Sequence, residues 1–312
     1  MECFTQSSDN IIQDWLFLSI HKGGFNMNIM KWATGALCGI MLFTFTGCGN
    51  TANTPSEPVA EQVEDADLTL QLTFWNDEKT EPQEPVEKQG KFTGTLIDGK
   101  PSGEGKFVTQ NSAGEEWYYE GQFTDGTITG QGGCYWTESG YQEVGTYENG
   151  LFVPTKAEFF DNTIRWYSSS MFKKTVELND TTLEFLQAHE NIFPATTEET
   201  KSEAMNLVDS SIEYKHLSKS TDDYLEKLIY FKNQELIQTE EFTMWGHTVT
   251  RMLTSDQNYT NHHFIFYDGS IDVFDGDNIT FVSLPIGSAS FNNVGGGTTN
   301  VIVSIASVVL KN

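Results

Sequence analysis

Glycine recurs at fixed intervals between residues 94 and 150, and this spacing constrains the fold more than any other feature of the chain. The glycines of the three series are Gly94, Gly99, Gly103 and Gly105, then Gly121, Gly126, Gly130 and Gly132, then Gly145 and Gly150. In the two complete series the later glycines follow the first by 5, 9 and 11 residues. A glycine-rich composition alone does not repeat three spacings, so residues 91–156 are predicted to contain about 2.5 structural repeats.

Each repeat has the pattern of a β-hairpin. Gly99 and Gly126 follow aspartate, and Asp-Gly is a strong signal for a two-residue hairpin turn because both turn positions need positive φ. The paired glycines later in each series leave room where strands or aromatic rings approach closely. One hairpin cannot bury an apolar face by itself, so the hairpins are expected to stack into a longer antiparallel sheet.

The spacing resembles that of MORN repeats, in which an aromatic residue stands two positions before the first glycine. The matching segments here are Phe92-Thr93-Gly94 and Tyr119-Glu120-Gly121. The resemblance implies a stack of antiparallel hairpins with an aromatic core. That core is expected to contain Phe92, Phe107, Tyr119, Phe123, Tyr135 and Tyr147. MORN repeats in other proteins are associated with contact to membrane lipid or to protein.

Four aromatic residues of the repeat region are not accounted for by the repeat pattern. They are Trp117, Tyr118, Trp136 and Tyr141. We therefore take these four as the candidate ligand contacts.

Residues 211–312 predict a second β domain. Five strand-like segments are separated by stretches rich in Gly, Asn and Asp. They are Leu228–Gln238, Phe242–Leu253, His262–Tyr267, Asn278–Leu284 and Asn300–Leu310. The arrangement resembles the OB-like domain of other Gram-positive lipoproteins, with Tyr214-Lys215 before the first strand, Gly276-Asp277 before the fourth, and Val301–Val309 as the closing strand. The resemblance implies a small five-stranded barrel.

Between the two β regions, residues 157–210 predict a short helical connector. Thr181 with Glu184 has the spacing of a capping box, and the helix it begins is expected to end near Phe193-Pro194. A second, polar helix is predicted from Thr197 to Val208. The expected fold is therefore mainly β, with hairpin repeats, a helical connector and a barrel.

Residues 27–47 have the pattern of a bacterial export signal. Lys31 is followed by the 14-residue apolar stretch 32–45, then by Thr46, Gly47 and Cys48. This stretch is short for a membrane span, which needs about 20 residues. The sequence FTGC resembles a lipobox, with phenylalanine in place of the usual leucine. The resemblance implies cleavage before Cys48, lipid on its thiol, and anchoring to the outer face of the cytoplasmic membrane, where two acyl chains hold stably.

Residues 1–26 do not belong to such a signal, and Lys22-Gly23-Gly24 can be encoded by a ribosome-binding sequence. We expect translation to start at Met27 or Met30. Residues 48–90 are predicted to be a lipidated cysteine followed by a disordered acidic tether, because the segment 49–89 contains prolines and has ten acidic residues against two lysines. The apolar patch 68–75 within them could be an additional strand, and this alternative stays open.

Charge and motifs narrow the functional classes. The chain has a formal net charge of −26, so it repels nucleic acid, and no nucleic-acid partner is expected. Cys134 is interpreted as a small buried hydrophobic residue. No catalytic motif is recognised, and neither the histidines His247, His262 and His263 nor the aspartates Asp272, Asp275 and Asp277 have metal-ligand spacing. We expect no cofactor, no metal and no catalytic residue.

These features favour a non-catalytic binding or scaffolding lipoprotein at the cell envelope. Its expected partners are the membrane, through the lipid anchor, and envelope proteins or wall polymers. Two alternatives remain open. One is a cell-wall or carbohydrate-active enzyme, and the other is a lipoprotein that binds a small ligand or a cation.

Overall fold

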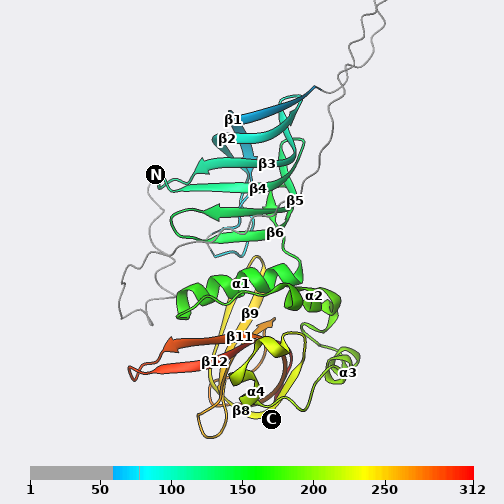
Figure 1. The fold of residues 1–312 in the computed structure, drawn as a ribbon, viewed down its shortest axis with the longest axis vertical. Helices are drawn as coiled ribbons and strands as arrows, with labels where there is room; N and C mark the ends of the chain where they lie inside the picture. Colours follow the sequence, from blue (N-terminus) through cyan, green and yellow to red (C-terminus); the bar gives the residue numbers. More distant parts are fainter. Residues whose placement is uncertain (1–58, 77) are drawn as a thin grey trace, which may run out of the picture. The chain divides into compact units, whose positions relative to one another are not determined.

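The computed structural model describes residues 59–312 except residue 77. The fold is mainly β, as predicted, and its strands form a seven-stranded antiparallel sheet and a five-stranded closed barrel (Figure 1). The strands of the sheet are β1 (Ala60–Leu72), β2 (Val86–Ile97), β3 (Lys100–Gln110), β4 (Glu116–Thr124), β5 (Thr127–Trp136), β6 (Gln142–Glu148) and β7 (Leu151–Phe152).

The seven strands follow one another in chain order as a meander. Three of its hairpins turn at the Asp-Gly or Asn-Gly pairs Asp98-Gly99, Asp125-Gly126 and Asn149-Gly150. Both residues of each pair have positive φ, at 49° to 52° for the first residue and 79° to 87° for the second. Such turns match the right-handed twist of the paired strands.

A row of glycines crosses the sheet where its strands pair. Gly94 opposes Gly105, Gly105 opposes Gly121, and Gly121 opposes Gly132, which in turn opposes Gly145. The side chain of Phe92 covers Gly94 and Gly105, and that of Tyr119 covers Gly121 and Gly132. An added Cβ at any of these four glycines would lie under 3.0 Å from an atom of the side chain that covers it. The row therefore lets the core aromatics lie flat against the backbone.

β1 corrects the predicted disordered tether over 48–90. Residues Ala60–Leu72 pair with β2 along nearly their whole length, and Leu70 and Leu72 are buried. The apolar patch 68–75 could have been either tether or strand. Its residues 68–72 belong to strand β1. Acidic composition masked the strand because the acidic side chains lie on its exposed positions.

After β1 the chain crosses the core face of the sheet before it returns to β2. We call residues 73–85, without residue 77, the return loop. The Phe74 ring meets Trp117 edge-on at 5.6 Å between centroids, and the Trp75 indole Nε1 donates to the carbonyl of Phe152 at 2.8 Å. The return loop thus contacts repeats far from it in the sequence and closes the apolar face.

A helix covers the far edge of the sheet. The helices are α1 (Lys156–Met171), α2 (Asp180–Ala188), α3 (Glu198–Asn206) and α4 (Tyr214–Lys219), with short 3-10 turns at Glu190–Ile192 and Asp222–Tyr224. The Asn162 amide of α1 accepts from the backbone N–H of Val144 at 2.9 Å and donates to its carbonyl at 2.7 Å. Glu158 accepts from the N–H of Thr146 at 3.1 Å. Because β7 pairs only with Tyr147 and Glu148, these side chains of α1 take the place of a partner strand along the earlier part of β6.

The connector differs from its prediction in two respects. The helix predicted from Thr181 begins at Asp180, with Asn179 as its N-cap; the Asn179 side chain accepts from the N–H of Thr182 at 2.9 Å. The Thr181–Glu184 capping box was therefore wrong, because Asn179 offers an equally good cap two residues earlier. The longest helix, α1, was not singled out, whereas α3 lies within the predicted 197–208.

The barrel consists of β8 (Ile229–Met244), β9 (His247–Ser255), β10 (His262–Asp268), β11 (Asn278–Asn292) and β12 (Thr298–Lys311). Going around it, the order is β8, β9, β10, β12, β11 and back to β8. β10 and β12 are parallel, and every other pair is antiparallel. The predicted break near 239–241 was wrong. β8 runs on to a two-residue turn at Trp245-Gly246, where both φ angles are positive.

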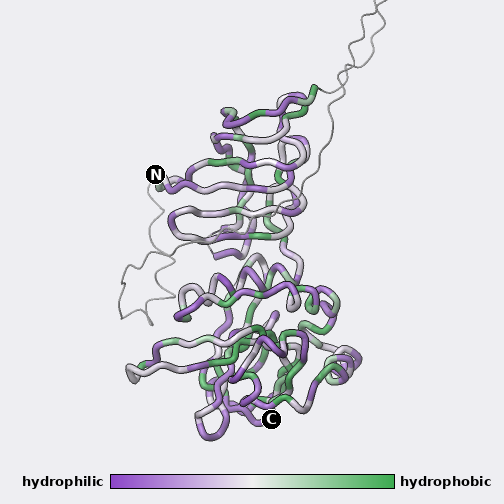
Figure 2. The backbone as a smooth tube through the Cα atoms, in the orientation of Figure 1, coloured by the Kyte–Doolittle hydropathy of each residue, from purple (hydrophilic) through white to green (hydrophobic). Residues whose placement is uncertain are grey.

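Both faces of β12 are buried, which explains its continuous apolar run. Residues 301–308 are all buried, since one face lines the barrel and the other packs under the connector, where Ser307 Oγ donates to the carbonyl of Ile192 at 2.6 Å. Figure 2 shows hydrophobic stretches (green) along the barrel strands. In the part of the chain that the structure describes, no helix has the length and apolar character to cross a membrane.

Candidate functional site

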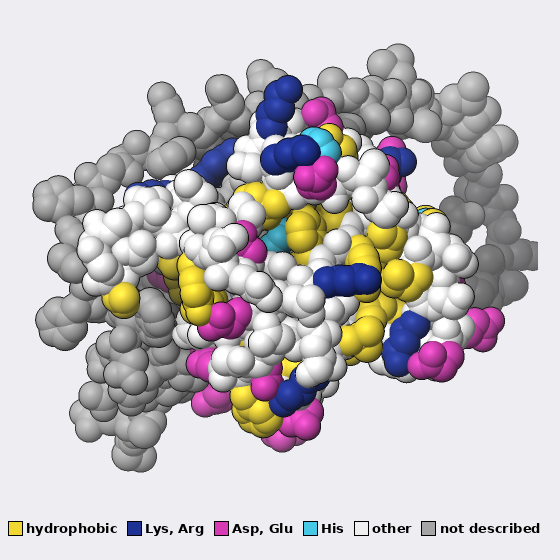
Figure 3. Space-filling model, turned by 90° about the horizontal axis from the view of Figure 1, so that it is seen from below, with side chains coloured by type: hydrophobic (Ala, Val, Ile, Leu, Met, Phe, Trp, Pro, Cys, Tyr) yellow, Lys and Arg dark blue, Asp and Glu magenta, His cyan; other side chains and the backbone are white. Residues whose placement is uncertain are grey.

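An open hollow of about 930 Å³ lies at one end of the barrel. Three segments far apart in the sequence form it: α4, the loop between β9 and β10, and the tip of the β11–β12 hairpin. Its lining is Glu213, Tyr214, Lys215, Ser218, Lys219, Thr260, Asn261, His262, Asn293, Thr298, Thr299 and Asn300. The volume falls in the range of small-molecule sites, but the lining consists mostly of amide, hydroxyl and charged groups. Figure 3, the view of the molecule from below, shows basic side chains (dark blue) beside hydrophobic ones (yellow).

Several lining groups hold the walls of the hollow in place. The Tyr214 hydroxyl donates to the carbonyl of His262 at 3.2 Å, which ties α4 to β10. Asn293 accepts from the N–H of Gly297 at 2.9 Å within the hairpin tip. Lys215 forms an ion pair with Glu213 at 2.9 Å. The first contact joins two of the three segments, and the other two contacts fix the local shape of the hairpin tip and of the α4 segment.

The two adjacent histidines point to opposite sides of β10, as their positions on a strand require. His262 is half-buried and lines the hollow, and burial lowers the pKa of its ring. His263 points into the barrel, where it is fully buried between Phe231 at 4.4 Å and Phe281 at 5.1 Å. The pair therefore cannot serve as two ligands of one metal.

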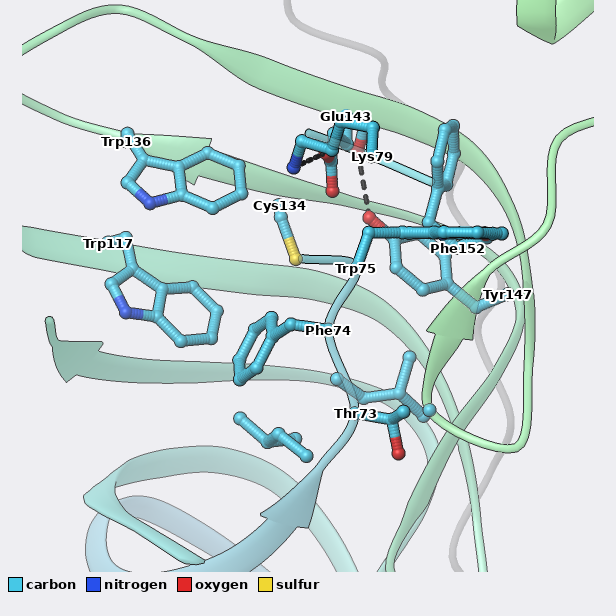
Figure 4. A pocket seen from close by; sticks show the side chains of 13 residues that line it. Thr73, Phe74, Trp75, Lys79, Trp117, Cys134, Trp136, Glu143, Tyr147 and Phe152 are labelled. Atoms are coloured by element: carbon cyan, nitrogen blue, oxygen red, sulfur yellow. Dashed lines mark hydrogen bonds and ion pairs between the residues drawn. The ribbon is translucent and has the colours of Figure 1, made fainter. Parts of the chain in front are cut away.

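A second cluster surrounds the carboxylate of Glu143 and joins the sheet to the β8–β9 turn of the barrel. Figure 4 shows Glu143 and Lys79 of this cluster beside the adjoining cavity. One carboxylate oxygen of Glu143 accepts from Lys79 at 2.9 Å, from the Tyr141 hydroxyl at 2.8 Å and from the Trp245 indole at 3.2 Å. Its donors come from the return loop, from the chain just before β6, and from the β8–β9 turn. Glu143 is itself the residue two positions before Gly145, where the other repeats have Phe92 and Tyr119.

The surroundings of this cluster favour a structural role. The adjoining cavity measures only about 30 Å³, which holds about one water molecule. Burial raises the pKa of the Cys134 thiol to about 12, so the thiol stays protonated at neutral pH and is a poor nucleophile. Burial also raises the pKa of Tyr141 and of Tyr147. We therefore interpret the cluster as a set of structural hydrogen bonds that holds the sheet against the barrel.

The four candidate aromatic contacts divide into two groups on opposite faces of the sheet. Trp117 is buried and stacks on Trp136 with centroids 5.8 Å apart, and Tyr141 packs on Trp136 at 5.0 Å. The return loop covers Trp117, so it is not available to a ligand. Tyr118 lies on the other face, where it stacks on Tyr135 at 4.9 Å with Lys106 3.8 Å from its ring. Tyr135, expected in the core, is thus half-buried on that face.

Two of the aspartates considered as cation ligands, Asp275 and Asp277, instead hold their own loop in place. Asp275 accepts from the N–H of Thr239 at 2.7 Å. Asp277 accepts from the N–H of Phe274 at 2.8 Å and pairs with Lys311 at 2.7 Å. Within residues 59–312, leaving out 77, no three His, Cys, Asp or Glu side chains are grouped as metal ligands.

The hollow was not predicted from the sequence. Asn, Thr and Ser are ordinary residues of turns and loops, and the lining residues are up to 87 positions apart in the chain, from Glu213 to Asn300. One signal was available: Lys215 and Lys219 lie on a short helix in a region with twice as many acidic as basic residues. The predicted lipid attachment at Cys48 lies outside the described residues.

Comparison of the chain with protein-family models, with curated proteins and with solved structures gives no match. The functional argument therefore rests on the sequence and on the geometry above.

Proposed function

We propose that this chain is a non-catalytic binding lipoprotein, held on the outer face of the cytoplasmic membrane by lipid on Cys48. The observation that carries the binding role is the open hollow at the barrel end. A hydrogen bond from Tyr214 to the carbonyl of His262 joins two of its three walls, and its groups are suited to hydrogen bonding. A formed concave surface of this size is what a binding module needs.

The strand arrangement supports the two structural resemblances. Hairpin turns at the first two glycine intervals, and a glycine row under Phe92 and Tyr119, support a MORN-type sheet. In order of sequence, the barrel pairs its first, second, third, fifth and fourth strands, with the third and fifth parallel. A closed barrel of five strands supports the resemblance to an OB-like domain. The proposal assigns these names to the sheet and the barrel, and fold alone does not specify the ligand.

The anchor part of the proposal is supported by the lipobox-like FTGC and by the chain length that follows it. Cys48 and Val59, the first described residue, are 11 residues apart in the sequence. A stretch of this length spans at most about 40 Å. With lipid on Cys48, β1 is therefore held near the membrane, and the predicted long tether is shortened by the strand.

The binding role is tested by cross-linking on intact cells that express the full chain, followed by recovery of the protein. We compare the wild type with Cys48→Ser, which removes the attachment point, and with Asn300→Leu, which alters the hollow. The proposal predicts a specific cross-linked product that both substitutions reduce. Lys106→Met, a change on the opposite face of the sheet from Trp117, serves as the matched surface control.

Two results would count against the proposal. A product formed equally by Asn300→Leu and the wild type would remove the hollow from the binding role. Turnover of a wall polymer by the purified chain would replace the non-catalytic proposal with an enzymatic one.

A further inference from the structure

The hollow differs from the rest of the molecule in its charge. The chain has 44 acidic and 18 basic residues, yet the charged lining consists of Lys215, Lys219 and Glu213. Basic side chains therefore outnumber acidic ones by two to one in this lining, the reverse of the proportion in the whole chain.

Several lining groups have no hydrogen-bonding partner within residues 59–312. Lys219, Ser218 and Asn300 are exposed, and no ion pair or side-chain hydrogen bond of these three is found in the described part. Lys219 and Ser218 come from α4 and Asn300 comes from β12, so these groups reach the hollow from two separate walls.

We propose, on the basis of the binding role above, that the hollow binds an anionic saccharide, a sugar that carries a carboxylate or a phosphate. Lys219 supplies the positive charge for the anionic group, with Lys215 nearby. Asn300 and Ser218 supply donors and acceptors for ring hydroxyls and acetamido groups. A neutral apolar ligand would leave these polar groups desolvated and unpaired, at a cost for each group.

The size of the hollow agrees with this class of ligand. At about 930 Å³ and open to solvent, it has room for a sugar and for its continuation as a chain. The open side allows a polymer to enter and leave the site, whereas a closed pocket would admit only a free sugar.

The test uses the full chain in detergent micelles and three probes that share one sugar ring. N-acetylmuramic acid carries a carboxylate, N-acetylglucosamine 6-phosphate carries a phosphate, and N-acetylglucosamine carries neither. Binding is measured by saturation-transfer NMR with titration. We expect the two anionic probes to bind more tightly than the neutral one, and the advantage to decrease with added salt. The preferred anionic probe identifies which acid the site accepts.

Lys219→Met is expected to weaken binding of the preferred anionic probe about five- to tenfold and to leave the neutral sugar unchanged. Because Lys219 is exposed, the thermal midpoint should not change. Lys106→Met, on the sheet, is the matched control and should bind like the wild type.

Equal binding of charged and neutral probes would overturn the proposal, and so would equal affinities of the Lys219→Met and Lys106→Met variants. Failure to bind any of the three probes would also overturn it. If the cross-linked product on cells still depends on Asn300 in that case, the binding role stands and only the ligand class is wrong.

Discussion

At the scale of single residues, the core of the sheet depends on glycines at positions where an aromatic side chain occupies the space that a Cβ would need. Gly132 is the clearest case, because an added Cβ would lie 2.2 Å from the hydroxyl of Tyr119 and 2.6 Å from its ring. Tyr119 is fully buried, so its ring cannot move aside without disturbing the core.

Gly132→Ala is therefore expected to lower the free energy of unfolding by about 1–3 kcal/mol. Urea denaturation measures the change. Gly287→Ala in β11 is the matched control, because its Cβ would meet only Val176 at 3.4 Å. Equal stabilities of the two variants would show that the close packing of Tyr119 is not what requires the glycine.

His263 makes the barrel sensitive to acid. Burial lowers the pKa of its ring to about 3, and both ring nitrogens lack a hydrogen-bonding partner in the described part of the chain. In the unfolded chain the ring takes up a proton near its ordinary pKa of 6.5. Between these two values the unfolded state binds more protons, so the contribution to stability is present above pH 6.5 and is lost as the pH falls toward 3.

His263→Phe is expected to reduce this pH dependence, which for one such group approaches about 1.4 kcal/mol per pH unit. The measurement is urea denaturation at several pH values from 4 to 7. The explanation would be wrong if the variant lost stability with falling pH as steeply as the wild type.

At the scale of elements, α1 covers the part of the β6 edge that β7 leaves unpaired. Asn162, which is 2% exposed, bonds both backbone groups of Val144. Without this side chain, one donor and one acceptor of the strand lose their partners. Leaving such groups unsatisfied costs about 1–3 kcal/mol.

Asn162→Leu is expected to lower the stability by a similar amount and to speed hydrogen exchange at the Val144 amide. Ser169→Ala, on the exposed side of the same helix, should do neither. If the Val144 amide kept its protection in Asn162→Leu, the edge-covering role of α1 would be refuted.

Local sequence signals predicted some elements well and others poorly. Asp-Gly turns and the apolar runs of β10 and β12 depend on neighbours in the chain, so the hairpins and most barrel strands could be anticipated. β1 could not, because the acidic residues Glu61, Glu64 and Asp67 stand on its exposed positions and resemble a solvated tether. The Trp245-Gly246 turn was missed because tryptophan rarely adopts positive φ, and here the contacts of its indole hold it.

The candidate site was harder to predict from the sequence than the strands and turns. Trp117 and Trp136 had no assigned role in the repeat pattern, yet the return loop fills the face where they lie. The hollow requires α4, the β9–β10 loop and the β11–β12 hairpin to converge, and this convergence is set by barrel closure. A single sequence gives no measure of such long-range placement.

At the scale of the whole molecule, the sheet and barrel are fastened through polar contacts as well as apolar ones. Besides the Glu143 cluster, Asp268 on β10 pairs with Lys156 of α1 at 2.8 Å. Burial by itself would raise the pKa of Asp268, but hydrogen bonds from His247 and Lys156 hold it below its usual value. Removing one member of such a buried group leaves charged partners unpaired.

Glu143→Gln is therefore expected to destabilise the fold by about 1–3 kcal/mol and to loosen the return loop around Lys79. Limited trypsin digestion measures how accessible the return loop is, and cleavage after Lys79 should become faster in the variant. Glu120→Gln, which alters an exposed pair with Lys106, is the matched control. Unchanged cleavage after Lys79 would show that the loop is held by its apolar contacts alone.

The central claim, an envelope protein anchored by lipid, is tested most directly by mass spectrometry of the protein extracted from bacterial membranes. The account predicts that the mature chain begins at Cys48 and that this residue carries a diacylglyceryl group. A mature chain that begins elsewhere, or an unmodified Cys48, would contradict it.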